Sequence, residues 1–296
     1  MNDPGSFLAG KRVAIVGLGL MGGSLALGLR GQVAELLAVD PDTATQALAI
    51  ERGLVDRVAA SLEEIVDLVD VIILAAPVGV ILEQLKSLGA LRRRSKDSLG
   101  RHTPGSVIVL DLGSTKQEIV AAMEILPEQF DPIGGHPMCG KETSGLANAD
   151  ASIYHGARFA FTPLERTSPR ARGFAEALAI LVGAVPFWTD PATHDGWAAA
   201  TSHVPFLLAS ALAGVTPPDT APLVGPGFRS TSRLAAASLP VMLDILKTNR
   251  QPVMEALHRF QSQVGEIEKC LAESDFTGLA SLLAAAAQRH QTLVQG

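Results

Sequence analysis

The N-terminal half of the chain alternates short apolar runs with longer amphipathic stretches. The apolar runs cover residues 12–16, 36–39, 71–76, 107–110, 159–162 and 185–188. Strands that are apolar at nearly every position are typical of parallel sheets that helices cover on both faces. The alternation of these runs with helical patterns therefore predicts an α/β fold with a doubly wound, mostly parallel sheet.

The character of the sequence changes at Asp190. Asp190 followed by Pro191 predicts a helix start, with Asp as the N-cap and Pro at the first helical position. The remaining sequence is typical of helices, with a break at 214–226, a helix start near Gln251 and a last helix over 277–294. We expect a sheet domain of residues 1–189 and an all-helical domain of residues 190–296.

The composition excludes several classes of protein. The chain has 296 residues, of which 47% are hydrophobic and 18% charged, so it is not a disordered protein. Its net charge of −6 leaves no overall basic field for nucleic acid or an anionic membrane. Cys139 and Cys270 are its only cysteines, which excludes a disulfide scaffold and fits a reducing cytoplasm. We find no signal peptide, and no apolar run reaches the ~18 residues of a membrane span. We therefore expect a cytoplasmic protein with no membrane partner and no metal site.

A glycine motif follows the first predicted strand. Gly17, Gly19 and Gly22 match G-x-G-x-x-G, and Asp40 closes the second strand 18 residues after Gly22. The glycines allow a tight turn and a close approach of a pyrophosphate, and a carboxylate at Asp40 binds the ribose hydroxyls and repels a 2′-phosphate. A glycine-rich turn without a ligand is the alternative. The pattern predicts a Rossmann-type domain that binds NAD rather than NADP. Small residues at the end of the third strand would leave room for the cofactor, with an ordinary strand end before a proline as the alternative. The expected cofactor-binding residues are Gly17, Gly19, Leu20, Met21, Gly22, Asp40, Ala76 and Pro77.

Two further segments follow apolar runs and carry candidate chemistry. Ser114 comes after the fourth run, so it is expected at the carboxyl edge of the sheet, where doubly wound folds bind ligands. His136 stands between Gly134-Gly135 and Pro137 in an expected loop, where the glycines allow unusual backbone angles and Pro137 stiffens the chain. An isolated loop histidine is more often a surface residue, but this placement favours a functional one.

These motifs resemble the prephenate and arogenate dehydrogenases of tyrosine biosynthesis. The resemblance spans roughly residues 12–250 and rests on GLGLMGGSLA, DLGSTK and GGHPMCGKETSG, on residues 155–163, and on His194-Asp195, 202–205 and 227–235. It implies an NAD-dependent enzyme that oxidises and decarboxylates prephenate to 4-hydroxyphenylpyruvate, or arogenate to tyrosine. The resemblance also implies a homodimer formed through the helical domain, and tyrosine as a candidate feedback inhibitor.

The resemblance implies a role for each residue that matches the family's motifs. His136 matches the catalytic histidine, and Ser114 matches a serine that hydrogen-bonds the substrate hydroxyl and the imidazole. Arg233 matches an arginine that binds a substrate carboxylate, the pairing that a guanidinium favours. His203 matches a histidine beside the substrate side chain, with a core histidine bonded to a carbonyl as the alternative. Glu142 matches an acid near the pocket mouth, with an exposed loop glutamate as the alternative.

The chain departs from the family pattern at three positions. Ser230 stands where many relatives have an acid, Leu243 where an aromatic residue is common, and Cys139 where a small residue is usual. Hydride transfer needs no nucleophile, so we interpret Cys139 as a packing residue. The basic stretch between Leu91 and Ser106 is expected to be a solvated loop, with contact to a phosphate or a partner as the alternative.

Three other functions remain as alternatives. Another β-hydroxyacid dehydrogenase would usually carry a lysine and an asparagine spaced three apart, whereas Lys247 and Asn249 are two apart. A non-enzymatic NAD sensor would keep the glycine motif without needing Ser114, His136, His203 and Arg233 together. A Ser–His hydrolase would need the G-x-S-x-G elbow, and Ser114 does not stand in one.

Overall fold

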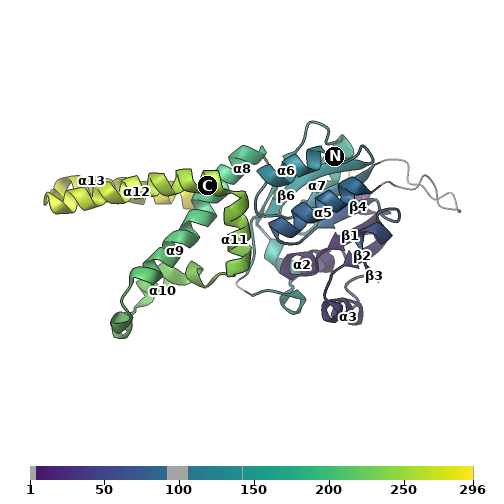
Figure 1. The fold of residues 1–296 in the computed structure, drawn as a ribbon, viewed down its shortest axis with the longest axis horizontal. Coiled ribbons are helices and arrows are strands. Elements are labelled where there is room, and N and C mark those ends of the chain that lie inside the picture. Colours follow the sequence, from purple (N-terminus) through teal and green to yellow (C-terminus); the bar gives the residue numbers. More distant parts are fainter. Residues whose placement is uncertain (1–4, 92–105, 142, 296) are drawn as a thin grey trace. The chain divides into compact units, whose positions relative to one another are not determined.

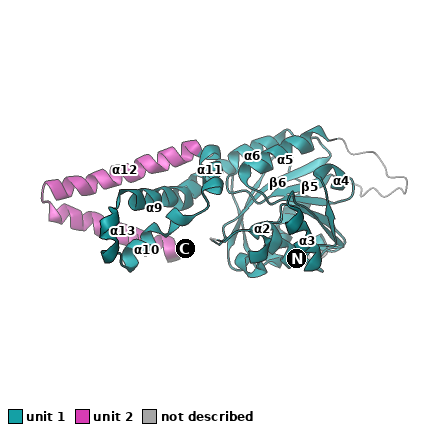
Figure 2. Cartoon of the chain, turned by 60° about the horizontal axis from the view of Figure 1, so that its bottom comes forward, with its two compact units in different colours: residues 1–249 teal, residues 250–296 magenta. Residues whose placement is uncertain are grey.

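The computed structural model describes residues 5–91, 106–141 and 143–295, and these divide into two compact units, 1–249 and 250–296 (Figure 2). The basic stretch at 92–105 and Glu142 lie outside the described residues. The first unit contains the sheet and the helices that precede Arg250. The second unit consists of α12 (Arg250–Ala272) and α13 (Phe276–Gln295), which pack against each other.

The described residues of the first unit form one eight-stranded sheet in the order β3-β2-β1-β4-β5-β6-β7-β8. Figure 1 shows this sheet with helices packed around it. All neighbouring strands are parallel except β6 and β7, which are antiparallel. The strands are β1 (Arg12–Val16), β2 (Glu35–Val39), β3 (Arg57–Ala59), β4 (Val71–Leu74), β5 (Val107–Asp111), β6 (Phe130–Pro137), β7 (Arg158–Pro163) and β8 (Val185–Trp188). This order confirms the predicted doubly wound, mostly parallel fold.

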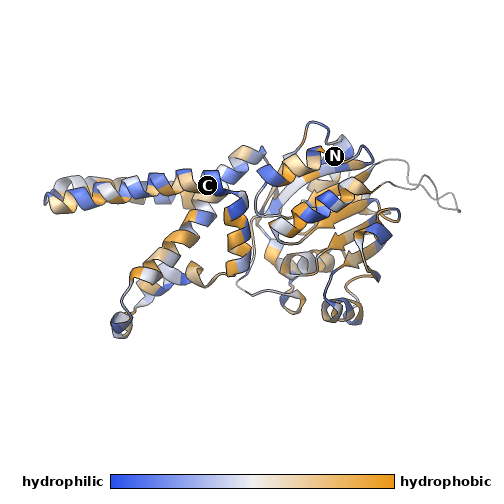
Figure 3. Ribbon diagram, viewed as in Figure 1, coloured by the Kyte–Doolittle hydropathy of each residue, from blue (hydrophilic) through white to orange (hydrophobic). Residues whose placement is uncertain are grey.

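Helices cover both faces of the sheet because its strands present apolar side chains to both. In β1, Val13 and Ile15 belong to one hydrophobic cluster, whereas Ala14 and Val16 belong to the other. Much of the sheet is accordingly coloured as hydrophobic in Figure 3. The first cluster includes α2 (Leu20–Leu29), α3 (Thr43–Glu51) and α7 (Pro169–Leu181), and the second includes α4 (Leu62–Ile65), α5 (Val78–Ala90) and α6 (Gln117–Glu124).

The rest of the first unit consists of helices and short helical turns. Asp190 caps the helix that was expected to start there, and its carboxylate accepts a hydrogen bond of 2.9 Å from the amide of Thr193. The elements are α1 (Gly5–Leu8), η1 (Leu146–Asn148), η2 (Ala151–Tyr154), α8 (Pro191–Ala198), η3 (Ala199–His203), α9 (Val204–Val215), η4 (Pro218–Leu223), α10 (Pro226–Ser232), η5 (Arg233–Ala236) and α11 (Leu239–Thr248).

The turn η3 is a π-helix that joins α8 to α9. Pro205 in the first turn of α9 lacks the amide that would bond to the carbonyl four residues earlier, so the helix widens just before it. Among the described residues, the continuous stretch Pro191–Val215 is long and apolar enough to cross a membrane by length and composition. The buried His194, Asp195 and His203 lie in this stretch. A core helix of a water-soluble protein passes the same test.

The structure corrects the prediction at β6. The sequence suggested a loop around His136 with unusual backbone angles, whereas His136 lies in a strand, opposite Ala160 of β7. Neither Gly134 nor Gly135 has a positive φ, so these positions need glycine for close packing and not for an unusual backbone conformation. A Cβ at Gly134 would collide with the Thr162 hydroxyl, and one at Gly135 would lie 2.8 Å from the Asp111 carbonyl oxygen. The three-residue β3 was also missed, because so short an edge strand carries little pattern.

Candidate active site

The glycine motif forms the turn between β1 and α2. Gly17 has φ +100°, and a Cβ there would lie 2.6 Å from the carbonyl oxygen of Ala75. A Cβ at Gly22 would collide with the carbonyl of Gly17, whereas Gly19 has open space beside it. The turn therefore brings β1, β4 and α2 together and leaves its middle glycine accessible to a ligand at the helix N-terminus.

Asp40 lies at the end of β2, where the sequence placed a ribose-binding carboxylate. Its Oδ2 accepts a hydrogen bond of 2.7 Å from the Leu18 amide, and its Oδ1 accepts one of 2.9 Å from the Asp42 amide. A carboxylate has about four acceptor positions, so two remain for ribose hydroxyls. With the open Gly19, this arrangement fits a dinucleotide. Leu20, Met21 and Ala76 are half-buried around the turn, and Pro77 is exposed at the start of α5.

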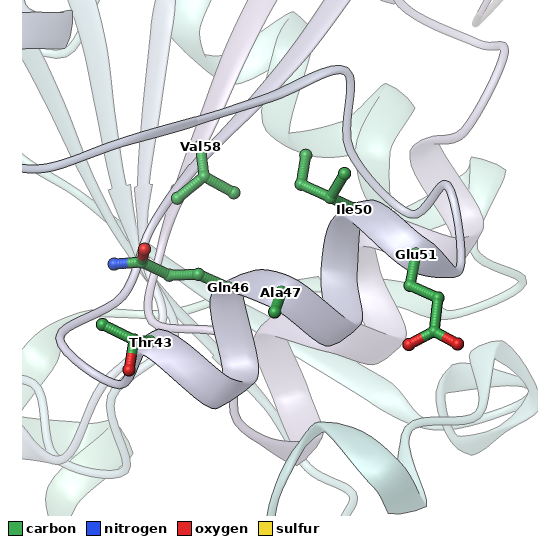
Figure 4. Close-up of a pocket in the computed structure, with 6 residues that line it drawn as sticks. All are labelled: Thr43, Gln46, Ala47, Ile50, Glu51 and Val58. Carbon is green, nitrogen blue, oxygen red and sulfur yellow. The ribbon is translucent and has the colours of Figure 1, made fainter.

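An open hollow lies beside α3 and the strand β3. It is lined by Thr43, Gln46, Ala47, Ile50, Glu51 and Val58 (Figure 4). Gln46 donates a hydrogen bond of 2.6 Å to the carbonyl of Asp40, so its amide is engaged in holding the end of β2. Glu51 is the one ionisable side chain in this lining. The hollow therefore offers no group of catalytic side chains.

A second cavity, of about 380 Å³, contains three of the predicted site residues. Ser114, His136 and His203 all line it, so the structure brings the carboxyl edge of the sheet to the π-helix. The remaining lining residues are Met138, Cys139, Thr201, Ser202 and Ile245. Burial raises the pKa of the Cys139 thiol to about 11, which makes a thiolate nucleophile unfavourable and supports its interpretation as a packing residue.

Arg233 and Glu142 are not brought into this cavity. Arg233 is exposed at the start of η5, a turn that packs against α9, and it is not one of the cavity-lining residues. Glu142 lies outside the described residues. Of the positions that depart from the family pattern, Ser230 is exposed on α10 and bonds to the carbonyl of Gly227, and Leu243 is exposed on α11. The roles expected for Arg233 and Glu142 therefore stay predictions.

A buried ion pair supports the strand that carries His136. Lys116 and Asp111 are both fully buried, and the Lys116 ammonium bonds to the Asp111 carboxylate and, at 2.7 Å, to the carbonyl of Gly135. Asp111 also accepts hydrogen bonds from the amides of Gly135 and Gly113. The pair thus fixes Gly135, the residue next to His136.

Both cavity histidines are held in the neutral form at neutral pH. Burial places the pKa of His136 well below its usual 6.5, and His194, Lys116 and His203 lower it further. Burial is also the largest influence on His203 and lowers its pKa to about 4, although Asp195 opposes the shift. A neutral imidazole has one nitrogen that accepts a proton and one that donates a hydrogen bond. The cavity can therefore accept a proton from a bound hydroxyl.

Comparison with known proteins decides the family. The family model for the prephenate dehydrogenase nucleotide-binding domain matches residues 24–185, and the model for the prephenate dehydrogenase dimerization domain matches residues 190–285. The chain belongs to the prephenate dehydrogenase family. The two family matches meet between residues 185 and 190, whereas the compact units of the structure divide after Asn249.

Named prephenate dehydrogenases resemble this family member over most of its length. The enzyme of Bacillus subtilis is 30% identical over 87% of this chain and 68% of its own. The enzyme of Lactococcus lactis is 30% identical over 90% of this chain and 72% of its own. The crystal structure of Aquifex aeolicus prephenate dehydrogenase with hydroxyphenyl propionate and NAD⁺ superposes with a TM-score of 0.83. It is 25% identical and covers 96% of this chain and 98% of its own.

The structure also brings to the site residues that had no predicted role. His194 and Asp195 appeared only within the family resemblance, yet His194 contacts His136 and Asp195 directly. Lys116 appeared only as the end of the DLGSTK motif, and Asn249 only in a comparison of spacing. The adjacent His194-Asp195 pair just after a helix cap was the one local signal for this network.

Proposed function

We propose that this member of the prephenate dehydrogenase family oxidises and decarboxylates prephenate with NAD⁺. The products are 4-hydroxyphenylpyruvate, CO₂ and NADH. The observation that carries this proposal is the convergence of Ser114, His136 and His203 on one cavity at the carboxyl edge of a dinucleotide-binding sheet. Arogenate, which would give tyrosine directly, is the alternative substrate.

The chemistry needs a group that takes a proton from the ring hydroxyl. As the hydroxyl-bearing carbon loses its hydride, the oxygen becomes a carbonyl, so its proton moves to the neutral His136. Bound NAD⁺ accepts the hydride. Ser114 lies in the same cavity, where its hydroxyl is suited to hold the substrate oxygen near the imidazole. Loss of CO₂ then gives the aromatic ring, and the phenol oxygen takes the proton back.

Substrate binding is assigned to His203, Arg233 and Glu142. His203 lines the cavity and is suited to donate a hydrogen bond to the substrate side chain. Arg233 is the expected partner of a substrate carboxylate, and Glu142 is expected near the entrance. Because Arg233 does not line the cavity, its role depends on how the bound substrate extends, and the substitution described in the Discussion tests it directly.

The cofactor assignment rests on Gly17, Gly19, Gly22 and Asp40. The open space at Gly19 suits a pyrophosphate, and the Asp40 carboxylate disfavours the 2′-phosphate of NADP. Leu20, Met21, Ala76 and Pro77 complete the expected cofactor-binding set.

We further propose a cytoplasmic homodimer with domains of residues 1–189 and 190–296. The matched C-terminal family model describes a dimerization domain, and α12 and α13 carry exposed Phe260, Leu271, Phe276 and Leu283. Free tyrosine is the candidate feedback inhibitor. Size-exclusion chromatography with light scattering is expected to give twice the chain mass of 30.9 kDa. A monomer mass at micromolar concentration would contradict the dimer.

The test of function is NADH formation by the purified protein. Prephenate and arogenate are offered in parallel with NAD⁺, and each is repeated with NADP⁺. Turnover of prephenate with NAD⁺ is expected. A strong preference for arogenate would show that arogenate, and not prephenate, is the substrate. No turnover of either compound by protein that binds NAD⁺ would refute the proposed reaction.

A further inference from the structure

His136 is held from behind by a second histidine and a buried carboxylate. The Nδ1 of His136 lies 2.9 Å from Nε2 of His194, and Nδ1 of His194 lies 2.8 Å from Oδ1 of Asp195. The His136 and His194 rings meet edge to face, with centroids 5.1 Å apart. His194 is 4% exposed and Asp195 is fully buried. The three side chains therefore form one continuous hydrogen-bonded row.

Asp195 is fixed in the ionised state by backbone donors. The amides of Lys116 and Gln117 donate hydrogen bonds of 2.7 and 2.9 Å to its two carboxylate oxygens. Burial acts to raise the pKa of Asp195, but the hydrogen bonds from His194, Gln117 and Lys116 outweigh it and lower the pKa overall. An ionised carboxylate only accepts hydrogen bonds, so Nδ1 of His194 must carry a hydrogen.

The hydrogen on Nδ1 of His194 decides whether its other ring nitrogen, Nε2, donates or accepts a hydrogen bond. In a neutral His194 with hydrogen on Nδ1, the nitrogen Nε2 has only a lone pair. Nδ1 of His136 must then donate to it, and the lone pair of His136 stays on Nε2, the nitrogen not bonded to His194. The row therefore sets the tautomer in which His136 acts as a proton acceptor in the cavity.

Asn249 sets the opposite tautomer in His203. Its side-chain amide lies 2.9 Å from the carbonyl oxygen of Asp195, and a carbonyl only accepts, so the facing atom is Nδ2. The same Nδ2 lies 3.1 Å from Nδ1 of His203. Nδ1 of His203 therefore accepts, and the hydrogen of this neutral ring stays on Nε2.

We propose that the buried network of Asp195, His194 and Asn249 fixes His136 and His203 in opposite tautomers, one as a proton acceptor and one as a hydrogen-bond donor. His194, Asp195 and Asn249 are positioning residues, since they act through the two cavity histidines. The acceptor suits the substrate hydroxyl, and the donor suits a carboxylate or keto oxygen of the side chain. The assignment of the tautomers is independent of the substrate, whereas its effect on catalysis rests on the proposed function.

The first experiment measures the tautomers without substrate or cofactor. The protein is labelled with ¹⁵N in its histidine rings, and NMR spectra are recorded at about pH 8, above the pKa of both cavity histidines. His136→Asn and His203→Asn assign the signals. We expect His136 with hydrogen on Nδ1 and His203 with hydrogen on Nε2. Both rings in the same tautomer, or His136 with hydrogen on Nε2, would overturn the proposal even if prephenate proves to be the wrong substrate.

The second experiment removes the bond behind His136. His194→Phe keeps a ring of similar size but offers no acceptor, whereas His194→Gln keeps an oxygen that can accept from Nδ1 of His136. We expect kcat of His194→Phe to fall about 10–100-fold, the range found for the hydrogen-bond partners that orient metal-binding histidines, with KM changed less than about threefold. The ¹⁵N signals of His136 should become a mixture of tautomers, and His194→Gln should recover most of the loss.

A matched control removes an imidazole elsewhere. His258 is exposed on α12, so His258→Phe should leave kcat and the His136 signals unchanged. Wild-type NAD⁺ affinity confirms that each variant is folded. A folded His194→Phe with wild-type kcat and an unchanged His136 tautomer would overturn the proposal.

Discussion

Replacing Lys116 by Met tests how the buried ion pair supports the site. Met keeps most of the length of the lysine side chain but removes the ammonium group that bonds to Asp111 and Gly135. Burial raises the pKa of Asp111 and lowers the pKa of Lys116, while their mutual attraction opposes both shifts. The pair therefore contributes less than its attraction alone, but breaking it leaves a carboxylate without its countercharge.

The expected loss follows from the complete burial of both groups. Removing one partner of a buried pair costs about 3–5 kcal/mol of unfolding free energy, since the remaining charge stays desolvated. For a unit of this size that corresponds to a melting temperature lower by roughly 6–20 °C. Because Lys116 also fixes Gly135 beside His136, kcat should fall as well.

The assay compares melting by circular dichroism at one protein concentration and without NAD⁺. Lys141→Met is the matched control, because Lys141 forms an ion pair of 2.8 Å with Asp150 in which both side chains are about 40% exposed (40% and 43%). Solvent screens such a pair, which contributes at most about 1 kcal/mol, so its loss should lower the melting temperature by no more than about 4 °C. Equal effects of the two substitutions would refute the reasoning.

Four further predictions concern the cavity and the cofactor. His136→Asn should lower kcat about 10²–10⁴-fold with NAD⁺ affinity nearly unchanged in titrations; an unchanged kcat would exclude it as the proton acceptor. The acceptor form of His136 exists above its lowered pKa and is lost only as the pH falls through that value. In wild type, kcat/KM should therefore stay flat from about pH 8 down to about 6.5, and a midpoint at 6.5 or above would contradict the burial argument. Arg233→Ala should mainly raise the KM for prephenate, by about tenfold or more, and an unchanged KM would refute its role as a carboxylate partner. Asp40→Ala should weaken NAD⁺ binding and reduce the ratio of NAD⁺ to NADP⁺ efficiency, measured from kcat/KM with each cofactor; an unchanged ratio would exclude Asp40 as the selecting residue.

Local signals in the sequence determined the fold class and the cofactor turn. Apolar runs that alternate with helical patterns predict a parallel sheet, and the glycine spacing with Asp40 predicts the dinucleotide turn, because each depends on residues close together in the chain. The helix start at Asp190 was confirmed for the same reason. The carboxyl-edge rule predicted Ser114 and the family resemblance predicted His203. Both line the same cavity, and their roles stay predictions.

Contacts between distant segments decided the rest. The strand β6 was missed because Gly134 and Gly135 disfavour strands locally, and only close packing against Thr162 and Asp111 explains them. A lysine is ordinarily exposed, so nothing local marked Lys116 as a buried residue.

The network behind His136 shows the same limit. His194 and Asn249 lie 58 and 46 residues from the histidines they contact, and a sequence does not encode which ring nitrogen faces which partner. The sequence by itself determined which residue types are available at the sheet edge and where the chain turns. Only the tertiary structure decided which nitrogen accepts and which donates, because a hydrogen-bonding direction is set by the partner that folding brings within about 3 Å.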